Sequence, residues 1–247
     1  MPTIKELTKS VLKKLRIFHP TRRIACEVYT ICQNLRSEES ISKIYITEYH
    51  RSHGYGLSSR QDNDNKRPSD YVIKREHTKS IMEVLPFLRK VLIGGCSGGM
   101  AIKTFREAGV DAWGFDISPN LEQILLPEIY PYVRQGSMTN IPFGPEDKFE
   151  ALITTDVLEH IQLKNINRMM EEMAKLNAKW MIHLINHTLI RKDHMTLKPI
   201  GWWEKRFSRV GYRRRMDMRC AVSEVPCVYG ADGDPEHEFT FWEKITQ

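Results

Sequence analysis

The sequence predicts an α/β protein built on a doubly wound, mostly parallel sheet. The first reason is that residues 91–119 contain a strand, a glycine-rich turn, a helix and a second strand that ends on an acid. The second reason is that short apolar runs alternate with segments of helical spacing as far as residue 185. This alternation is typical of parallel βαβ units. The length of 247 residues fits one such domain with additions.

The first of these units has the features of a nucleotide site. A short apolar run at Val91–Ile93 predicts a buried strand, and glycines then permit a tight turn and close approach of a ligand. Helical spacing over Met100–Ala108 and a second strand over Ala112–Phe115 follow, and Asp116 stands at the end of that strand. A helix N-terminus receives anionic groups, and an acid in this place binds a ribose diol. The unit therefore predicts a ligand that contains a nucleoside.

The spacing of the glycines narrows the class of ligand. No register supplies the G-x-G-x-x-G of dinucleotide-binding proteins, and no G-K-[ST] follows as in a P-loop. Instead, Ile93-x-Gly95-x-Ser97-x-Gly99 resembles motif I of the class I S-adenosylmethionine (SAM)-dependent methyltransferases, which usually reads [DE]-x-G-x-G-x-G. Ile93 replaces the acid that usually anchors the methionine ammonium, and Ser97 replaces the middle glycine.

Two later segments also match this family. Residues 136–143 (GSMTNIPF) resemble the G-D-[AV]-x-x-L-P-F turn beside the adenine, with Ser137 in place of the acid. Residues 155–161 (TDVLEHI) match the segment that follows the fourth strand. The resemblance covers about residues 72–190, and it implies a seven-stranded Rossmann-like sheet with SAM as cofactor. It implies cofactor contacts at Gly95, Cys96, Ser97, Gly99, Asp116, Ile117, Ser137, Met138 and Thr155.

The remaining elements of the sheet domain are predicted from periodicity and turn signals. They are helices over 71–85, 121–126 and 166–176, strands over 132–135, 149–154 and 178–185, a helix that begins within 199–202, and last strands over 213–219 and 237–245.

The N-terminal part has a different character. A capping box at Thr3 and Glu6 opens an amphipathic basic helix over Ile4–Phe18, and a second helical stretch covers Arg23–Leu35. Residues 44–68 are then rich in Tyr, His, Gly and Arg. We expect a lid over the active site there, with Tyr49, His50, His53 and Tyr55 as candidate contacts. The predicted organisation is residues 1–70 as N-terminal helices and lid, and residues 71–247 as the SAM-binding domain.

Candidate catalytic residues follow from the chemistry. Methyl transfer from a sulfonium requires alignment, and a hydroxyl acceptor also needs a general base. His160 is the first candidate because its segment leaves the fourth strand at the carboxyl edge of the sheet. His194 is the second, since residues 194–203 (HMTLKPIGWW) resemble an H-x-T-x-[RK]-x-x-x-W-W tail of glycan-modifying O-methyltransferases. Asp156 is the third. The tryptophans of the tail, Trp202 and Trp203, suit either sugar stacking or core packing.

The segment after the fourth strand also allows a metal half-site. A helix that began at Asp156 would place Asp156, Glu159 and His160 on one face, with His187 or His194 as a further ligand. Some methyltransferases hold a metal at a similar E-x-x-E-H cluster, whereas many with D-V-L-E-H have no known metal. We expect no metal site, and full turnover after exhaustive chelation.

The resemblance implies O-methylation of a sugar hydroxyl on a glycan or small molecule. Two alternatives stay open. RNA ribose methylation is one, because residues 191–219 carry ten Lys/Arg against three acids; no RNA-binding module is visible, so we expect no nucleic acid partner. A catalytically degenerate SAM-binding scaffold is the other, which the substitutions Ile93, Ser97 and Ser137 favour slightly.

The amino-acid composition indicates in which cellular compartment the protein is expected. Five cysteines, an odd number without C-x-x-C spacing, favour reduced thiols in a cytoplasmic protein. No run approaches the roughly 18 apolar residues of a membrane span. Residues 1–24 carry seven Lys/Arg and one Glu. The helix over Ile4–Phe18 therefore suits packing on the domain, a homodimer contact, or peripheral contact with an anionic membrane.

Overall fold

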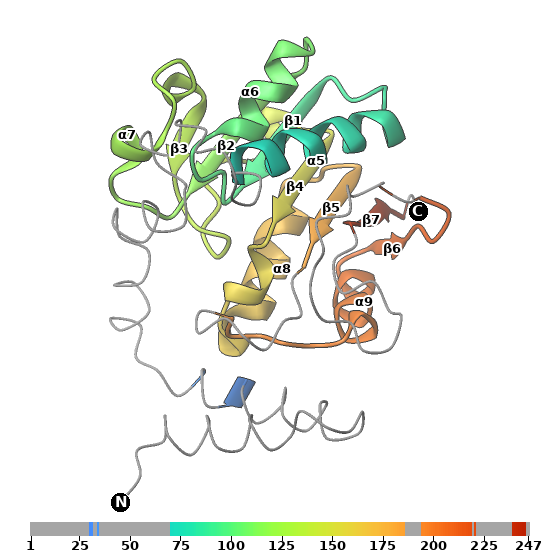
Figure 1. Ribbon diagram of the computed structural model, residues 1–247. Coiled ribbons are helices and arrows are strands. Elements are labelled where there is room, and N and C mark those ends of the chain that lie inside the picture. The colour runs from blue at the N-terminus through green and yellow to red at the C-terminus, as the bar shows by residue number, and fades with distance from the viewer. Residues whose placement is uncertain are drawn as a thin grey trace, which may run out of the picture.

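A computed structural model describes residues 30, 31, 34, 70–185, 194–218, 220 and 239–245. These form a seven-stranded sheet of order β3-β2-β1-β4-β5-β7-β6 with helices against it (Figure 1). Strand β7 is antiparallel to both of its neighbours, and β1 to β5 are parallel. The predicted α/β, doubly wound, mostly parallel sheet is confirmed.

Of the predicted N-terminal helical extension, Thr30, Ile31 and Asn34 are described, and all three are helical. The helix predicted over Ile4–Phe18 lies outside the described residues. So does the lid predicted over 44–68, with its candidate contacts Tyr49, His50, His53 and Tyr55.

The elements of the sheet domain lie close to their predicted positions. The strands are β1 (Lys90–Gly94), β2 (Asp111–Asp116), β3 (Val133–Gln135), β4 (Ala151–Thr155), β5 (Trp180–Leu184), β6 (Tyr212–Arg214) and β7 (Phe239–Lys244). The helices are α5 (Asp70–Val84), α6 (Met100–Glu107), α7 (Leu121–Ile124), α8 (Ile166–Lys175) and α9 (Ile200–Arg209). In the described part of the chain, no helix combines the length and apolar character needed to cross a membrane.

Strand β6 is shorter than predicted. The strand expected over 213–219 ends at Arg214, because the chain turns where the Met218 amide donates to the Arg215 carbonyl (3.4 Å). The Arg215 guanidinium binds Asp217 (2.6 Å) and Glu243 (2.8 Å), which holds this turn against β7.

The strands alternate between two apolar layers, one on each face of the sheet. Val91 and Ile93 of β1 pack in the layer formed with α5, α6 and α7. Leu92, between them, packs in the layer formed with α8 and α9. Helix α8 contributes Ile166, Met169, Met170 and Met173, which share one buried face at helical spacing. A buried parallel sheet requires cover on both faces, and these helices provide it.

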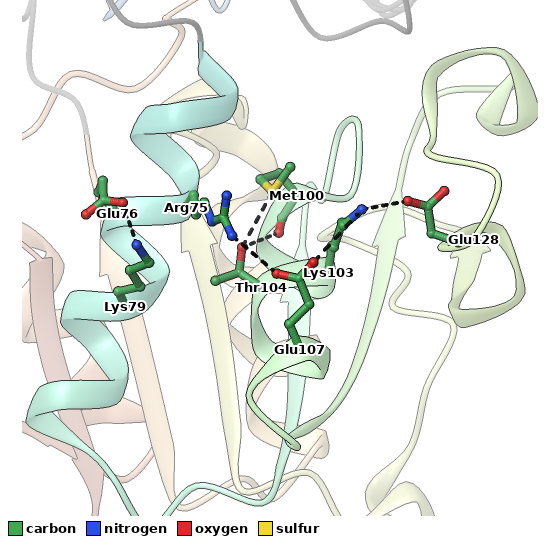
Figure 2. Close-up of polar contacts among 8 residues, drawn as sticks. All are labelled: Arg75, Glu76, Lys79, Met100, Lys103, Thr104, Glu107 and Glu128. Atoms are coloured by element: carbon green, nitrogen blue, oxygen red, sulfur yellow. Dashed lines mark hydrogen bonds and ion pairs between the residues drawn. The ribbon is translucent and has the colours of Figure 1, made fainter. Parts of the chain in front are cut away.

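Helices α5 and α6 are also joined by ion pairs across their exposed sides (Figure 2). Arg75 of α5 lies 3.6 Å from Glu107 of α6. Lys103 lies 4.0 Å from the same Glu107 and 2.8 Å from Glu128. About half of each carboxylate side chain is exposed, so each pair adds at most about 1 kcal/mol. The apolar layer beneath, which includes Ile81 and Phe105, therefore dominates this contact.

Candidate active site

The turn after β1 has a backbone shape that requires glycine at residue 95. Gly95 has a φ of +65°, and a Cβ there would lie 2.6 Å from a methyl of Val157. The amides of Gly95 and Cys96 both donate to the Phe115 carbonyl, at 2.9 and 3.1 Å. The end of β2 thereby fixes the turn. Gly99, with φ +83°, precedes the first residue of α6.

Asp116 organises the same turn through both carboxylate oxygens. Its Oδ2 accepts from the Ser97 amide and its Oδ1 from the Ser118 amide, each at 2.9 Å. Ser97 has a φ of +49°, in the left-handed region that favours glycine. A serine therefore occupies the place of the family's middle glycine at a strain of about 1 kcal/mol.

Three residues near the turn face the apolar core. Ile93 is buried between α6 and the sheet, so no side-chain carboxylate stands at this position. The Cys96 side chain lies within 2.9 Å of the position that a Cβ on Gly114 would take. Burial raises the pKa of this thiol well above its usual value, so its backbone is the part available to a ligand. Met138 is buried, with its sulfur against Gly94.

The other predicted cofactor residues lie at the ends of β2, β3 and β4. The Gly136 amide donates to the Asp116 carbonyl (2.9 Å) and joins the two loops. Ile117 leaves half of its surface exposed, and the Ser137 hydroxyl lies 3.1 Å from that of Thr139. Thr155 is the half-buried last residue of β4. The nine predicted cofactor residues therefore lie in the turns or at the strand ends on one edge of the sheet.

The chain does not form the helix at Asp156 on which the considered metal half-site depends. Asp156 has a left-handed backbone, with φ +54°, and its amide donates to Leu184 of β5 (3.0 Å). A single 3-10 turn, Leu158–His160, takes the place of the helix. Asp156, Glu159 and His160 therefore do not share a helical face. The Oδ1 atom of Asp156 is buried and accepts no hydrogen bond from the described residues.

The fold brings Glu159 and His160 together with His194, one of the two further ligands considered, and we call these residues the Glu159–His160–His194 cluster. One candidate ligand atom from each residue lies within 4.8 Å of the other two. The Nε2 atom of His194 is 3.9 Å from Oε1 of Glu159. The two imidazoles meet edge to face, with centroids 5.0 Å apart. These three residues could hold a metal ion. His187, the other ligand considered, lies outside the described residues.

The two candidate bases, His160 and His194, differ in their solvent exposure. His194 and Glu159 are fully buried, whereas His160 is half-buried. His160 is therefore the more accessible of the two imidazoles.

Backbone hydrogen bonds hold the His194 segment against the turn that carries Glu159. The amides of Met195 and Thr196 both donate to the Glu159 carbonyl, at 2.7 and 2.9 Å. The Thr196 hydroxyl donates to the Ile161 carbonyl at 2.6 Å. His194 is therefore placed by three bonds that do not involve its own ring.

Two N-terminal residues hold the other side of the same segment. The Asn34 amide group donates to the Met195 carbonyl (3.0 Å) and accepts from the Leu163 amide (2.5 Å). The Thr30 hydroxyl accepts from the Leu197 amide (3.2 Å). Asn34 thus joins the loop after His160 to the loop after His194. The sequence carried no signal for this contact, because Asn and Thr within a helical stretch are unremarkable.

The tryptophans of the tail divide between core and surface. Trp203 is fully buried in the layer with α8, so it is a core residue. Trp202 is partly exposed, but the Arg206 guanidinium lies 3.0 Å from the centroid of its ring. One face of Trp202 is therefore already covered.

Residues 92–179 match a family model for methyltransferase domains. This part of the chain, which runs from β1 through β4 and α8, is similar to methyltransferase domains. No curated protein matches the chain.

Solved methyltransferase structures share the fold. The 1,6-didemethyltoxoflavin-N1-methyltransferase of Burkholderia thailandensis has a TM-score of 0.59 at 11% identity, over 86% of this chain and 92% of that one. Magnesium protoporphyrin IX methyltransferase of Synechocystis PCC 6803 has a TM-score of 0.55 at 15% identity, over 80% and 97%. The small RNA methyltransferase HEN1 has a TM-score of 0.51 at 13% identity, over 76% and 27%. At these identities the likeness concerns the fold alone.

Proposed function

We propose that this methyltransferase transfers the methyl group of SAM to a hydroxyl of a sugar or another small-molecule acceptor. The observation that carries this proposal is the Glu159–His160–His194 cluster after β4 and β5, on the same edge of the sheet as the glycine turn. A neutral hydroxyl is a weak nucleophile and needs its proton removed. Imidazoles suit that task at neutral pH.

SAM would bind at the carboxyl ends of β1 to β4, where the predicted cofactor residues lie. The Gly95–Gly99 turn receives the methionine part, and Asp116 accepts hydrogen bonds from the ribose hydroxyls. The half-exposed side chain of Ile117 would cover the adenine of a bound cofactor, and Ser137 and Met138 would lie beside it. The Burkholderia and Synechocystis enzymes are both described with bound S-adenosylhomocysteine, and they share this fold.

The reaction then needs alignment and one proton transfer. The acceptor oxygen attacks the methyl carbon as the bond from carbon to sulfur breaks, which releases S-adenosylhomocysteine. The hydroxyl proton passes to the Glu159–His160–His194 cluster, with the half-buried His160 as its acceptor. Glu159 and His194 orient the His160 ring, and Asp156 is the next candidate base.

Replacement of His160 tests this function directly. His160→Gln should lower turnover about 100-fold or more while SAM affinity stays nearly unchanged, because the loss arises only in the transition state. The acceptor is first identified by mass spectrometry of glycan and metabolite extracts incubated with SAM. Near-normal turnover of both His160→Gln and His194→Gln would place the base elsewhere. Loss of SAM binding together with turnover would mean that the histidine is structural.

A second candidate acceptor is the ribose of RNA. The basic stretch 191–219 and the fold shared with a small RNA methyltransferase favour it. An RNA mobility shift at increasing salt tests this alternative, because phosphate contacts weaken steeply as counterions are added.

The other alternative is a degenerate scaffold that binds SAM without turnover on any acceptor, and calorimetry with SAM tests it.

We also propose a cytoplasmic location. The free thiols of Cys96 and Cys220 are both buried, and unpaired cysteines suit a reducing compartment.

A further inference from the structure

We propose that the Asp156 carboxylate binds the ammonium group in the methionine part of SAM. It would do so in place of the acid that Ile93 replaces. This inference deepens the proposed function, because it rests on SAM as the cofactor. It assigns Asp156 to the cofactor and leaves His160 and His194 as the candidate bases.

The residue in the place of the motif I acid cannot pair with a cation. Ile93 has an apolar side chain, and it packs in the core layer with α6. The ammonium of the cofactor carries a full positive charge, and its hydrogen bonds are roughly twice as strong when the acceptor is ionised. A carboxylate from another element would therefore supply the charge that this position lacks.

The topology places Asp156 beside the glycine turn. Strands β1 and β4 are parallel neighbours, with Gly94 opposite Thr154, so the chain leaves the sheet side by side after both strands. A Cβ on Gly95 would lie 2.6 Å from a methyl of Val157, the residue that follows Asp156. Asp156 therefore borders the turn that would receive the methionine part.

The same two strands form the switch point of the sheet. On one side of β1 lie β2 and β3, and on the other side lie β4 and β5 (Figure 1). Doubly wound sheets bind their ligands in the crevice at the carboxyl ends of such a pair. Asp156, directly after β4, stands at this crevice.

Two polar atoms at this switch point have incomplete hydrogen bonding. The Oδ1 atom of Asp156 is buried and has no hydrogen-bond partner among the residues that the structure describes. The same holds for the hydroxyl of Ser97, in the middle of the glycine turn, and Ser97 is only 6% exposed. Buried polar atoms without partners are costly and rare in folded proteins. Two of them on adjoining loops indicate that a polar ligand binds there.

The backbone holds the Asp156 carboxylate in place before a ligand binds. The Asp156 amide donates to the Leu184 carbonyl of β5 (3.0 Å), and φ is +54°. Asp and Asn adopt this left-handed region more readily than other residues with a side chain. A group that is already held in place loses little conformational freedom on binding, which favours affinity.

A pair of ligands that differ only in the amino group tests the proposal. They are S-adenosylhomocysteine and its deaminated analogue, in which hydrogen replaces the amino group. Calorimetry on the full chain measures both affinities, with displacement of S-adenosylhomocysteine for the weaker ligand. The first variant is Asp156→Asn, because Asn has nearly the same size and also tolerates the left-handed backbone. The second is Asp156→Gly, which has no side chain to strain.

The wild type should prefer S-adenosylhomocysteine over the analogue, because only the first offers an ammonium to the carboxylate. Both variants should bind S-adenosylhomocysteine at least about 10-fold more weakly than the wild type. Their affinity for the analogue should not fall. Asp116→Ala should weaken both ligands alike, since both contain the ribose. Asp111→Asn, at the opposite end of β2, is the matched control and should bind both ligands as the wild type does.

The outcomes separate this inference from the proposed function. A wild type that binds neither ligand would contradict SAM as the cofactor, and the proposed function would fail with it. If the wild type binds S-adenosylhomocysteine and the variants keep its full preference, only the role of Asp156 fails. Equal weakening of both ligands in the variants would also overturn the proposal, because it would mean that Asp156 supports the shape of the turn.

Discussion

At the scale of single residues, Asp116 and His183 show how burial determines the role of a titratable group. The Asp116 carboxylate is buried and accepts two backbone hydrogen bonds at the cofactor turn. His183 of β5 is fully buried, stacks on Phe207 and contacts the Thr154 hydroxyl at 2.7 Å. The first residue is placed for a ligand and the second for the core.

Asp116→Ala should weaken SAM binding by about 1–3 kcal/mol, because charge-assisted hydrogen bonds to the ribose are lost. Calorimetry measures the affinity, and thermal unfolding shows whether the Ser97 turn survives. Asp111→Ala, at the opposite end of the same strand, is the matched control and should leave the affinity unchanged. An unaltered affinity in Asp116→Ala would remove this residue from the site.

His183 should make the protein less stable in acid. Burial lowers the pKa of its imidazole to about 3, below the unfolded value of about 6.5. The unfolded chain therefore binds the proton first. The stabilisation is complete above pH 6.5 and declines by about 1.4 kcal/mol per pH unit as pH falls toward 3.

Urea unfolding between pH 7 and pH 5 measures this loss in the wild type and in His183→Gln. The variant should lose about 2 kcal/mol less than the wild type over this range, since it has no imidazole to protonate. Parallel pH dependence in the two proteins would show that His183 does not titrate as described.

At the scale of elements, the acceptor side of the site is built from connections between helices and strands. The His194 segment lies between the 3-10 turn Leu158–His160 on one side and residues Thr30 and Asn34 on the other. Neither neighbour belongs to the sheet. The cofactor side, by contrast, consists of turns fixed directly by β1 and β2. The two halves of the site can therefore be disturbed separately.

Thr30→Val and Asn34→Ala should each lower turnover about 10-fold without weakening SAM binding, because a small displacement of the catalytic group is costly. Thr30→Ser keeps the hydroxyl and should retain turnover, which a merely space-filling role would not predict. Thr78→Val is the matched control, since Thr78 is a buried threonine whose hydroxyl donates to the Lys74 carbonyl of its own helix, α5. Normal turnover in both Thr30→Val and Asn34→Ala would mean that these bonds do not position His194.

At the scale of the whole molecule, the parallel sheet gathers residues from distant parts of the chain at one edge. The carboxyl ends of β1, β2, β3 and β4 lead into the predicted cofactor residues. The ends of β4 and β5 lead into His160 and His194. This is the edge at which doubly wound sheets bind their ligands. The predicted division at residue 70 separates Thr30 and Asn34 from the segment that they contact.

Residues 70–247 alone should therefore bind SAM within a few-fold of the full chain and lose at least about 10-fold in turnover, because separate contacts act nearly independently. Calorimetry and the methyl-transfer assay measure the two quantities on the same preparation. Full turnover by the shortened chain would show that the N-terminal part is dispensable for the acceptor site.

Much of the sheet domain could be predicted because its signals are local. The apolar run before Gly95 and the acid after Phe115 predicted a strand, a turn and a second strand, and the structure contains them. The helical face considered at Asp156 also came from a local signal, and the structure does not contain it. Residue spacing alone suggested a helical face, whereas a hydrogen bond to Leu184 of the neighbouring strand sets the backbone there.

Local sequence patterns were enough to predict the fold class, the positions of the strands along the chain and the polar residues that follow them. Apolar periodicity, glycine positions and residue type depend on neighbours within a few positions, so one chain suffices to recognise them. Local patterns did not indicate that His194 is buried against Glu159 and His160, or that Asn34 bonds to a residue 161 positions away. Those facts depend on packing between distant segments, which local patterns do not encode.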